Sequence, residues 1–236
     1  MPITTPKEPT LIAFGGSFDP PHVGHVGCVQ QAMRRFPQAQ VRILPAAAPP
    51  TINGRLKTVA SSFDHRLAMA QLAFSPLGPR VQVSTLELDL PRPNYTVNTL
   101  RYLSSQYPHE RLGFLLGQDQ WSALPKWHEP MQILQLADLI VVARRGTRDL
   151  EVETDQTARS LGLDLCWHSS GSCATLGTTA HHAFFIIEPV SAATSSDLRL
   201  AMTQQTLHSS TLGWLPPAVA TYIDHHHLYS SSKDNL

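Results

Sequence analysis

Residues 15–25 read Gly-Gly-Ser-Phe-Asp-Pro-Pro-His-Val-Gly-His, and they join a short apolar run to a helical pattern. The run before them, Leu11-Ile12-Ala13-Phe14, is apolar and followed by glycines, which is typical of a buried parallel strand. From residue 23 to residue 36 the apolar side chains recur with helical spacing. The stretch is therefore predicted to be a loop that leaves a buried strand and ends at a helix N-terminus.

The composition of this loop suits a phosphate ligand. Glycines let the backbone approach a ligand closely, Pro20 and Pro21 stiffen the turn, and the free N–H groups of a first helical turn attract phosphate. His22 and His25 are three residues apart, so both side chains are predicted to point from one face toward that phosphate. The loop therefore indicates a site that transfers a nucleotidyl group.

A zinc site is the main alternative for two histidines at this spacing. Metalloprotease helices use His-Glu-x-x-His, whereas no Glu stands between His22 and His25 and the sequence offers no obvious third ligand nearby. The other histidine groups, at 181–182 and 225–227, are interpreted as solvated. The sequence also lacks the Walker Gly-Lys-Ser/Thr loop and the Gly-x-Gly-x-x-Gly fingerprint, which disfavours a P-loop enzyme and a dinucleotide oxidoreductase.

Composition bounds the class of protein. The chain has 236 residues, of which 42% are hydrophobic, so we expect one domain over 1–236 with a sizeable core. Lys and Arg number 18, as do Asp and Glu, and this balance disfavours a nucleic-acid partner. Three cysteines without Cys-x-x-Cys spacing encode no disulfide framework. Residues 1–10 are predicted to be flexible, and the lack of a signal peptide or membrane-length run favours a cytoplasmic protein with no membrane partner.

Strands and helices are predicted to alternate along the chain. Strand-like runs at 41–44, 81–88, 112–116, 139–143 and 184–187 are separated by helical patterns that include 63–74 and 96–107. This alternation predicts an α/β fold: a Rossmann-like, doubly wound parallel sheet with helices on both faces. Ligands then bind at the carboxyl ends of the strands near the topological switch point, where the loop with the two histidines is expected. Residues 145–183 are rich in Ser, Gly and Thr toward their end and are predicted to form an irregular excursion.

Further motifs give the sequence a family resemblance. They are Asn94-Tyr95-Thr96-Val97-Asn98-Thr99-Leu100, Gly117-Gln118-Asp119 with Leu124-Pro125-Lys126-Trp127, Thr194-Ser195-Ser196-Asp197-Leu198-Arg199, and the closing Leu215-Pro216-Pro217 with Tyr222-Ile223. Together with the opening loop, they resemble the bacterial nicotinate-mononucleotide adenylyltransferases of the HxGH nucleotidyltransferase superfamily over nearly the whole chain. The resemblance implies an enzyme of NAD biosynthesis that joins the AMP of ATP to nicotinate mononucleotide, with Mg²⁺ held mainly by the ATP phosphates.

The resemblance also implies roles for individual residues on the ATP side. His22, His25 and Arg199 are the implied catalytic residues, with His25 nearest the reacting phosphate and Arg199 on the departing pyrophosphate. Asp119 is expected either to contact the adenosine ribose or to organise the metal-bound nucleotide. The implied ATP-binding residues are Phe14, Gly15, Gly16, Ser17, Phe18, His22, His25, Gly117, Asp119, Ser195, Ser196 and Arg199.

On the acceptor side, the resemblance places Trp127 on the nicotinate ring and Thr96, with nearby backbone amides, on its carboxylate. A flat ring after Pro125 in a polar stretch can stack on a pyridine without being part of the core. The implied acceptor-binding residues are Gly15, Ser17, Tyr95, Thr96, Trp127, Arg55 and Lys57.

One loop departs from the family pattern. A basic residue usually follows Pro-Pro-His after the second strand, whereas here Pro49-Pro50 is followed by Thr51-Ile52-Asn53-Gly54-Arg55-Leu56-Lys57. Either Arg55 or Lys57 is expected to bind the acceptor phosphate, or acceptor affinity is weaker than usual.

Two alternatives stay open at this stage. The first is an adenylyltransferase for another acceptor, such as nicotinamide mononucleotide or phosphopantetheine. The second is a non-catalytic nucleotide-sensing module, which would be free to lose His22, His25 and Arg199. The sequence leaves a homodimer open.

Overall fold

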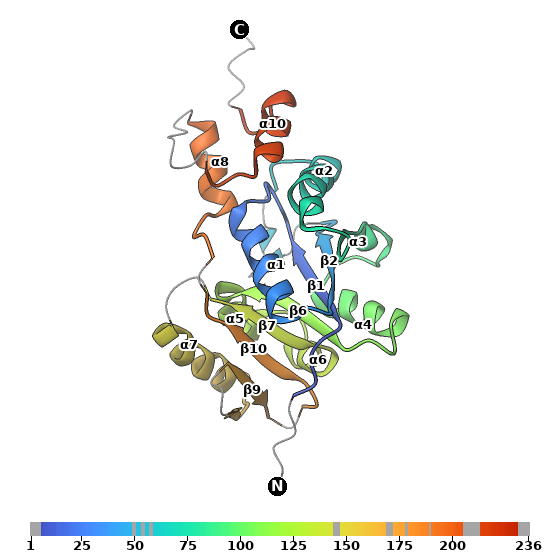
Figure 1. The fold of residues 1–236 in the computed structure, drawn as a ribbon, viewed down its shortest axis with the longest axis vertical. Helices are drawn as coiled ribbons and strands as arrows, with labels where there is room; N and C mark the ends of the chain where they lie inside the picture. Colours follow the sequence, from blue (N-terminus) through green and yellow to red (C-terminus); the bar gives the residue numbers. More distant parts are fainter. Residues whose placement is uncertain are drawn as a thin grey trace.

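A computed structural model of the protein describes residues 6–48, 51–52, 55–56, 59–143, 147–168, 172–177, 179–188, 190–204 and 213–230. Its centre is an eight-stranded sheet in the order β5-β2-β1-β6-β7-β10-β9-β8 (Figure 1). The strands are β1 (Leu11–Gly16), β2 (Gln40–Pro45), β5 (Val81–Val83), β6 (Leu112–Gly117), β7 (Asp138–Val142), β8 (Leu165–Trp167), β9 (Cys173–Leu176) and β10 (His182–Ile186). The first six in sheet order run parallel, and β9 and β8 extend the sheet with antiparallel pairings. A separate hairpin joins β3 (Thr51–Ile52) to β4 (Arg55–Leu56).

Helices cover both faces of this sheet. They are α1 (Val23–Arg35), α2 (Phe63–Phe74), α3 (Leu86–Asp89), α4 (Thr96–Gln106), α5 (Gln118–Ala123), α6 (Pro130–Leu136), α7 (Thr147–Ser160), α8 (Ser195–Thr203) and α10 (Pro217–His225), with short 3₁₀ turns at Ser75–Leu77 and Leu124–Lys126. Alternate residues of β1 enter different cores: Ile12 and Phe14 pack with α1, α2, α8 and α10, whereas Leu11 and Ala13 pack with α4, α5 and α6. A strand buried on both sides has no polar face, which explains the apolar run that the sequence shows. The predicted doubly wound α/β fold is confirmed.

The switch point of the sheet lies between β1 and β6. From β1 the chain builds outward through β2 to β5, then returns to place β6 on the other side of β1 and continues through β7 to β10. The pairing of β1 with β6 covers Leu11–Ala13, so the carboxyl ends of the two strands, Gly16 and Gly117, lie beyond it at the same end of the sheet. In Figure 1, α2, α8 and α10 gather at one end of the molecule, away from the N-terminus.

Two predictions about local structure are wrong. The strand predicted over 81–88 ends at Val83, because the Ser84 hydroxyl accepts a hydrogen bond from the Leu86 N–H (3.2 Å) and the chain turns into α3. The segment 145–183, predicted to be irregular, contains α7, β8, β9 and the first residues of β10. Its helix is mostly polar, and the buried side chains among its described residues 152–160 are Thr154, Thr157 and Ala158, so its buried face carries few large apolar residues.

The N-terminal arm is held more firmly than its composition indicates. Pro9 is buried and lies against Gly113, where an added Cβ would approach the Pro9 Cβ to 2.9 Å. The Thr10 N–H donates to the Arg111 carbonyl (2.8 Å), and Glu8 pairs with Arg35. Residues 8–10 therefore contact β6 and α1, residues 1–5 lie outside the described part of the chain, and the flexibility of 1–10 stays a prediction.

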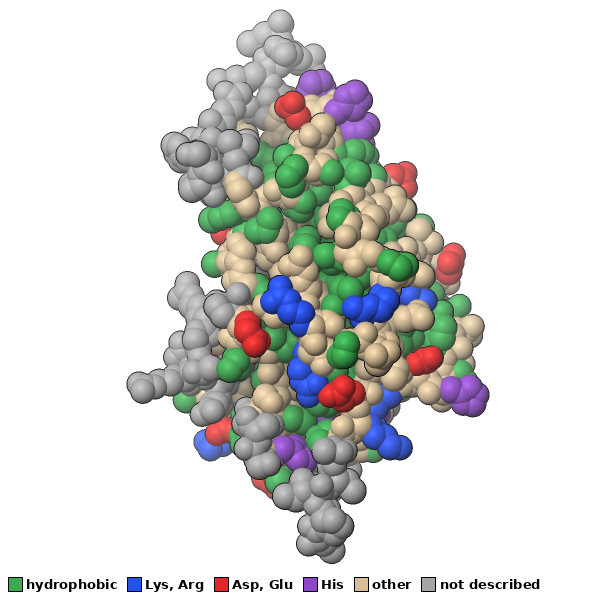
Figure 2. Space-filling model, in the orientation of Figure 1, with side chains coloured by type: hydrophobic (Ala, Val, Ile, Leu, Met, Phe, Trp, Pro, Cys, Tyr) green, Lys and Arg blue, Asp and Glu red, His purple; other side chains and the backbone are tan. Residues whose placement is uncertain are grey.

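The histidines at the end of α10 are exposed, as Figure 2 shows at the top of the molecule. His226 packs against the rings of Tyr222 (4.2 Å between centroids) and His65 (5.2 Å). Across the described residues, no helix is long and apolar enough to cross a membrane.

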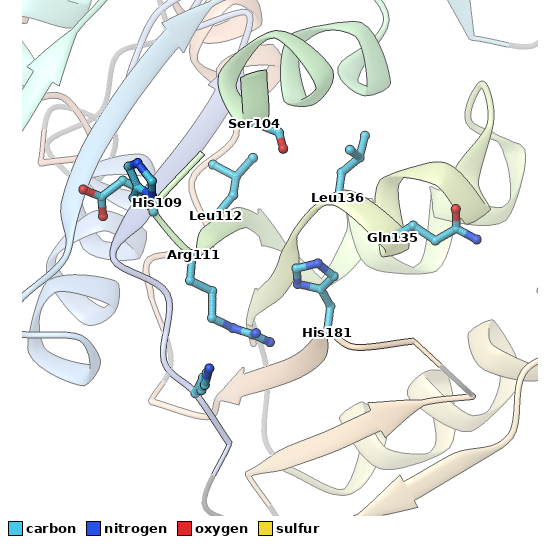
Figure 3. A pocket seen from close by; sticks show the side chains of 9 residues that line it. Ser104, His109, Arg111, Leu112, Gln135, Leu136 and His181 are labelled. Carbon is cyan, nitrogen blue, oxygen red and sulfur yellow. The ribbon is translucent and has the colours of Figure 1, made fainter. Parts of the chain in front are cut away.

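The amino ends of the strands are closed by a charged cluster around Asp138, which is completely buried. Arg111 donates to both of its carboxylate oxygens (2.5 and 2.6 Å), the His182 N–H donates to Oδ1 (2.8 Å), and His181 Nδ1 lies 3.4 Å from it. Figure 3 shows Arg111 and His181 converging beside a cleft of about 380 Å³, with Leu112 and Leu136 in its wall. Because Asp138 neutralises Arg111, this cluster is a structural clamp between β6, β7 and β10.

The clamp makes the stability of the protein sensitive to acid. Burial alone would raise the pKa of Asp138, but hydrogen bonds from His181, Arg111 and the His182 main chain outweigh it and hold the pKa below its usual value. Burial lowers the pKa of His182, with Asp138 opposing this shift. In both cases the unfolded chain binds protons at a higher pH than the folded protein, so stability rises with pH.

We therefore expect the free energy of unfolding to fall in two windows as the pH drops. The contribution of His182 is lost from about pH 6.5 downward, and that of Asp138 from about pH 4 downward, because these are the usual unfolded pKa values. Asp138→Asn leaves Arg111 without its partner and is expected to lower stability by about 3–5 kcal/mol. Urea unfolding between pH 3 and 8 measures both effects. The exposed neighbour Glu110, changed to Gln, is the control, and equal losses in the two variants would contradict the clamp.

Candidate active site

The loop after β1 is anchored by Phe18. This residue has a left-handed backbone conformation (φ 49°), which is unfavourable for a bulky side chain. Its ring is 1% exposed and meets the rings of Phe14 and Phe74 edge-on, with centroids 5.6 and 5.5 Å away. Burying the ring offsets the backbone strain and turns the chain sharply, so that Gly15 stays exposed at the edge of the sheet.

The two histidines lie one upon the other at the start of α1. His22 precedes the first helical residue and is 2% exposed, whereas His25 is partly exposed. Their rings stack with centroids 3.7 Å apart at an interplanar angle of 29°. His25 Nδ1 accepts a hydrogen bond from the His22 N–H (3.2 Å). A neutral ring that accepts at Nδ1 carries its proton on Nε2, so His25 is prepared to donate from its other nitrogen.

Gly24 makes this stacking possible. A Cβ at position 24 would lie 2.8 Å from the Ser191 carbonyl oxygen and 2.9 Å from His22 Nδ1. The glycine between the histidines thus lets the start of α1 approach both the His22 ring and the strand-to-helix connection before α8. The His-x-Gly-His pattern therefore has a packing reason as well as a chemical one.

Arg199 reaches the same loop from α8. Its Nη1 donates to the Asp19 carbonyl (2.6 Å), and its Nη2 donates to the Ser196 hydroxyl (3.3 Å). Ser195 donates to the Pro20 carbonyl (2.9 Å), so the first turn of α8 is fastened to the histidine loop. The Arg199 side chain remains 22% exposed. The structure thus brings His22, His25, Ser195, Ser196 and Arg199 together.

A second group of predicted site residues lies at the N-terminus of α4. Tyr95 lies immediately before this helix, Thr96 is its first residue, and the Tyr95 ring stacks on His128 (4.1 Å, 26°). Trp127 is partly buried and meets Phe114 edge-on at 6.1 Å. The structure therefore places the start of α4 beside Trp127 and His128. His128 was missed at the sequence level, and its position directly after Trp127 was the available signal.

Glu87 was also missed, because it lies in the segment read as a strand. It is 8% exposed, accepts a hydrogen bond from the Thr99 hydroxyl (2.9 Å), and its main-chain carbonyl accepts one from Asn94 Nδ2 (2.7 Å). Burial raises the pKa of this carboxyl group. Glu87 thereby fastens α3 to the first turns of α4.

The remaining predicted site residues differ in how far they are buried. Gly117 ends β6, and Asp119 is exposed in the first turn of α5. Phe14 and Phe18 are buried behind His25, with the Phe18 ring 5.1 Å from the His25 ring. Arg55 belongs to β4, but its side chain and the whole of Lys57 lie outside the described part of the chain.

A doubly wound sheet with stacked His-x-Gly-His histidines at its switch point defines the class of α/β nucleotidyltransferases. The cytidylyltransferase-like family profile matches residues 13–211, and the chain belongs to this family. The resemblance to nicotinate-mononucleotide adenylyltransferases is confirmed at the same time by the relatives that the chain matches.

Two of these relatives are similar over almost their full length. A probable nicotinate-nucleotide adenylyltransferase of Albidiferax ferrireducens is 36% identical over 221 residues, which cover 93% of this chain and 97% of the relative. One of Cronobacter sakazakii is 34% identical over 227 residues, covering 95% and 98%. Among solved structures, nicotinic acid mononucleotide adenylyltransferase of Plasmodium falciparum complexed with NaAD superposes with a TM-score of 0.67 at 16% identity, over 94% of this chain and 98% of that one. At that identity, the superposition supports the fold.

Proposed function

We propose that this protein is a nicotinate-nucleotide adenylyltransferase, which transfers AMP from ATP to nicotinate mononucleotide and releases pyrophosphate. The observation that carries the proposal is the stacked His22–His25 pair at the switch point, with Arg199 fastened to the same loop. Relatives with this activity in their names match 93–95% of the chain. The reaction is a step of NAD biosynthesis.

The chemistry requires positioning more than covalent participation by the protein. A phosphate oxygen of nicotinate mononucleotide attacks the α-phosphorus of ATP, and the bond from that phosphorus to the α,β-bridging oxygen breaks as pyrophosphate leaves. The attacking oxygen is already anionic, so no strong base is needed. Catalysis then depends on alignment and on stabilising charge on the phosphate oxygens.

In this proposal, His25 donates from Nε2 to an oxygen of the α-phosphate, and His22 holds the His25 ring in place by stacking and through its main-chain N–H. Arg199 binds the departing pyrophosphate, with Ser195 and Ser196 at the N-terminus of α8. Gly15, Gly16 and Ser17 line the path of the nucleotide. Gly117, at the end of β6, and Asp119, in the first turn of α5, lie on the adenosine side, while the buried rings of Phe14 and Phe18 support the loop.

On the acceptor side, Trp127 stacks on the nicotinate ring and Tyr95 completes the wall through His128. The nicotinate carboxylate meets Thr96 and the first N–H groups of α4, which have no partner within the helix. Arg55 or Lys57 binds the acceptor phosphate from the loop after β2.

Magnesium enters this proposal bound to the ATP substrate. Among the residues that the structure describes, no group of three or more His, Cys, Asp or Glu side chains is arranged to hold a metal ion. Mg²⁺ in nucleotide-binding sites is usually held by substrate phosphates, water and one or two carboxylates, so its ligands in this proposal are mainly the ATP phosphate oxygens and water. The ion would neutralise phosphate charge, and Asp119 is an exposed carboxylate two residues after the end of β6.

A pyrophosphate-release assay with ATP and a panel of acceptors tests the function. We expect turnover with nicotinate mononucleotide and much weaker turnover with the amide, because helix N–H groups that face a carboxylate are mismatched by an NH₂ group. Removal of magnesium should abolish the release. Equal kcat/KM values for acid and amide would contradict the acceptor assignment, and ATP binding without any release would favour a nucleotide sensor.

His25→Ala should lower kcat by about a hundredfold, because it removes a donor aimed at the transition-state oxygens. The fold should persist, since the ring is partly exposed. The control His109→Ala removes an exposed histidine just before the amino end of β6, away from the carboxyl ends where His25 lies, and should leave kcat unchanged. A folded His25→Ala protein with near-parental kcat would show that His25 is not catalytic.

Trp127→Ala should raise the KM for nicotinate mononucleotide and leave the KM for ATP nearly unchanged. Loss of a stacked ring costs about 1–3 kcal/mol, which corresponds to roughly five- to 150-fold in affinity. Trp167→Ala on the edge strand β8 is the matched control, because it removes the same side chain far from the switch point. A change confined to the KM for ATP would move Trp127 out of the acceptor site.

A further inference from the structure

Asp19 carries a buried carboxylate inside the histidine loop. It is 1% exposed, and both of its oxygens are used: Oδ2 accepts from the Ala60 N–H (2.6 Å) and Oδ1 from the Tyr229 hydroxyl (2.7 Å). The donors come from 41 and 210 residues further along the chain. Because a buried carboxylate is costly without such partners, these hydrogen bonds fix where the loop lies.

Arg199 takes its orientation from the same residue. Its Nη1 donates to the Asp19 main-chain carbonyl (2.6 Å) and lies 3.8 Å from Asp19 Oδ2. A guanidinium group is a planar fork, so fixing one edge determines the direction of the other. A shift of Asp19 would therefore redirect the group that is proposed to hold pyrophosphate.

Tyr229 connects the turn after α10 to Asp19 and to α8, the helix that carries Arg199. It follows α10 in a turn with a left-handed backbone (φ 63°), where the Leu228 N–H donates to the Ile223 carbonyl (3.0 Å). Its own carbonyl accepts from the Thr203 hydroxyl (3.4 Å) at the end of α8, the helix of Arg199. Burial raises the pKa of Tyr229, so its hydroxyl stays protonated as a donor to Asp19 even in alkaline solution.

We propose that Tyr229 and Asp19 act together to position two groups for adenylyl transfer, Arg199 and the histidine loop (residues 15–25). Through this pair, the turn after α10 holds the two groups in place relative to each other. The proposal rests on the proposed function and adds two residues to it. Neither needs to touch a substrate, since Asp19 is buried and Tyr229 acts through it.

The chain offers a matched control on the same closing helix. The Tyr222 hydroxyl hydrogen-bonds to His65 Nδ1 (3.0 Å) and thus joins α10 to α2. Tyr222→Phe and Tyr229→Phe each remove one hydroxyl that fastens the C-terminal segment. A purely stabilising role predicts that the two variants behave alike.

We expect Tyr229→Phe to lower kcat about tenfold and to weaken pyrophosphate inhibition by a similar factor, because a hydrogen bond to a charged group is worth a factor of this order. The KM for nicotinate mononucleotide should stay within twofold of the parent, since α4 and Trp127 are not disturbed. Tyr222→Phe should keep parental kcat and inhibition, even where its Tm falls as much. Parental values in Tyr229→Phe, or equal losses of kcat in both variants, would overturn the proposal.

A double-mutant cycle with Asp19→Asn shows whether the two residues act together. Asn keeps the shape of Asp but removes its charge, so Asp19→Asn should lower kcat in the same direction. In the double variant, the loss should be smaller than the product of the single losses, because both changes disrupt one interaction. Independent, multiplicative losses would contradict the pair.

Calorimetry of ATP and of pyrophosphate separates this proposal from the function on which it rests. If the parent binds both ligands but transfers nothing to nicotinate mononucleotide, the acceptor assignment fails, and weaker pyrophosphate binding by Tyr229→Phe still supports the pair. If the parent binds neither ligand, both proposals are overturned.

Discussion

The buried carboxylate of Asp19 is the constraint on which the rest of the active-site end depends. A carboxylate at 1% exposure requires compensating donors and nearby positive charge. The protein meets this requirement with Ala60 before α2, Tyr229 after α10, and Arg199 on α8. Arg66, also buried, donates to the Ser17 carbonyl in the same loop (2.9 Å). Satisfying one charge thus gathers α2, α8 and the C-terminal turn around the histidines, as their grouping in Figure 1 shows.

Charged residues serve different purposes at the amino and at the carboxyl ends of the strands. At the amino ends, the Asp138 carboxylate accepts from Nε and Nη2 of Arg111, so the Asp138 cluster is internally neutralised and serves to join strands. At the carboxyl ends, Arg199 Nη1 donates a hydrogen bond to the Asp19 main-chain carbonyl, and the Arg199 side chain remains 22% exposed. Arg199 Nη1 also lies 3.8 Å from Asp19 Oδ2, so Arg199 is paired with a carboxylate less closely than Arg111 is paired with Asp138. In the proposed function, this difference favours the carboxyl ends of the strands for a phosphate ligand, where the first turn of α8 also lies.

The residues proposed to bind the acceptor are also supported indirectly, by residues behind them. Trp127 and Tyr95 offer rings, but their placement depends on residues behind them: Phe114 meets Trp127 edge-on, and His128 stacks on Tyr95. Glu87 holds the start of α4 through Thr99. A flat ligand between such rings meets surfaces whose orientation is set before it binds, which reduces the entropy that binding costs.

The sequence by itself determined the strand β1, the helix α1, the doubly wound architecture and the position of the two histidines at its switch point. These were predictable because an apolar run, a helical period and a glycine-proline loop are local patterns with local physical causes, whereas the meeting of Arg199 with this loop was implied by the family resemblance. It did not determine that His22 is buried beneath His25, that 145–183 forms a helix and sheet strands, or that Glu87 braces α4. Only the tertiary structure joined Tyr229 to Asp19 across 210 residues. Hydrogen bonds of that kind depend on which polar groups are buried together, and burial is decided by packing of the whole chain rather than by neighbours in sequence.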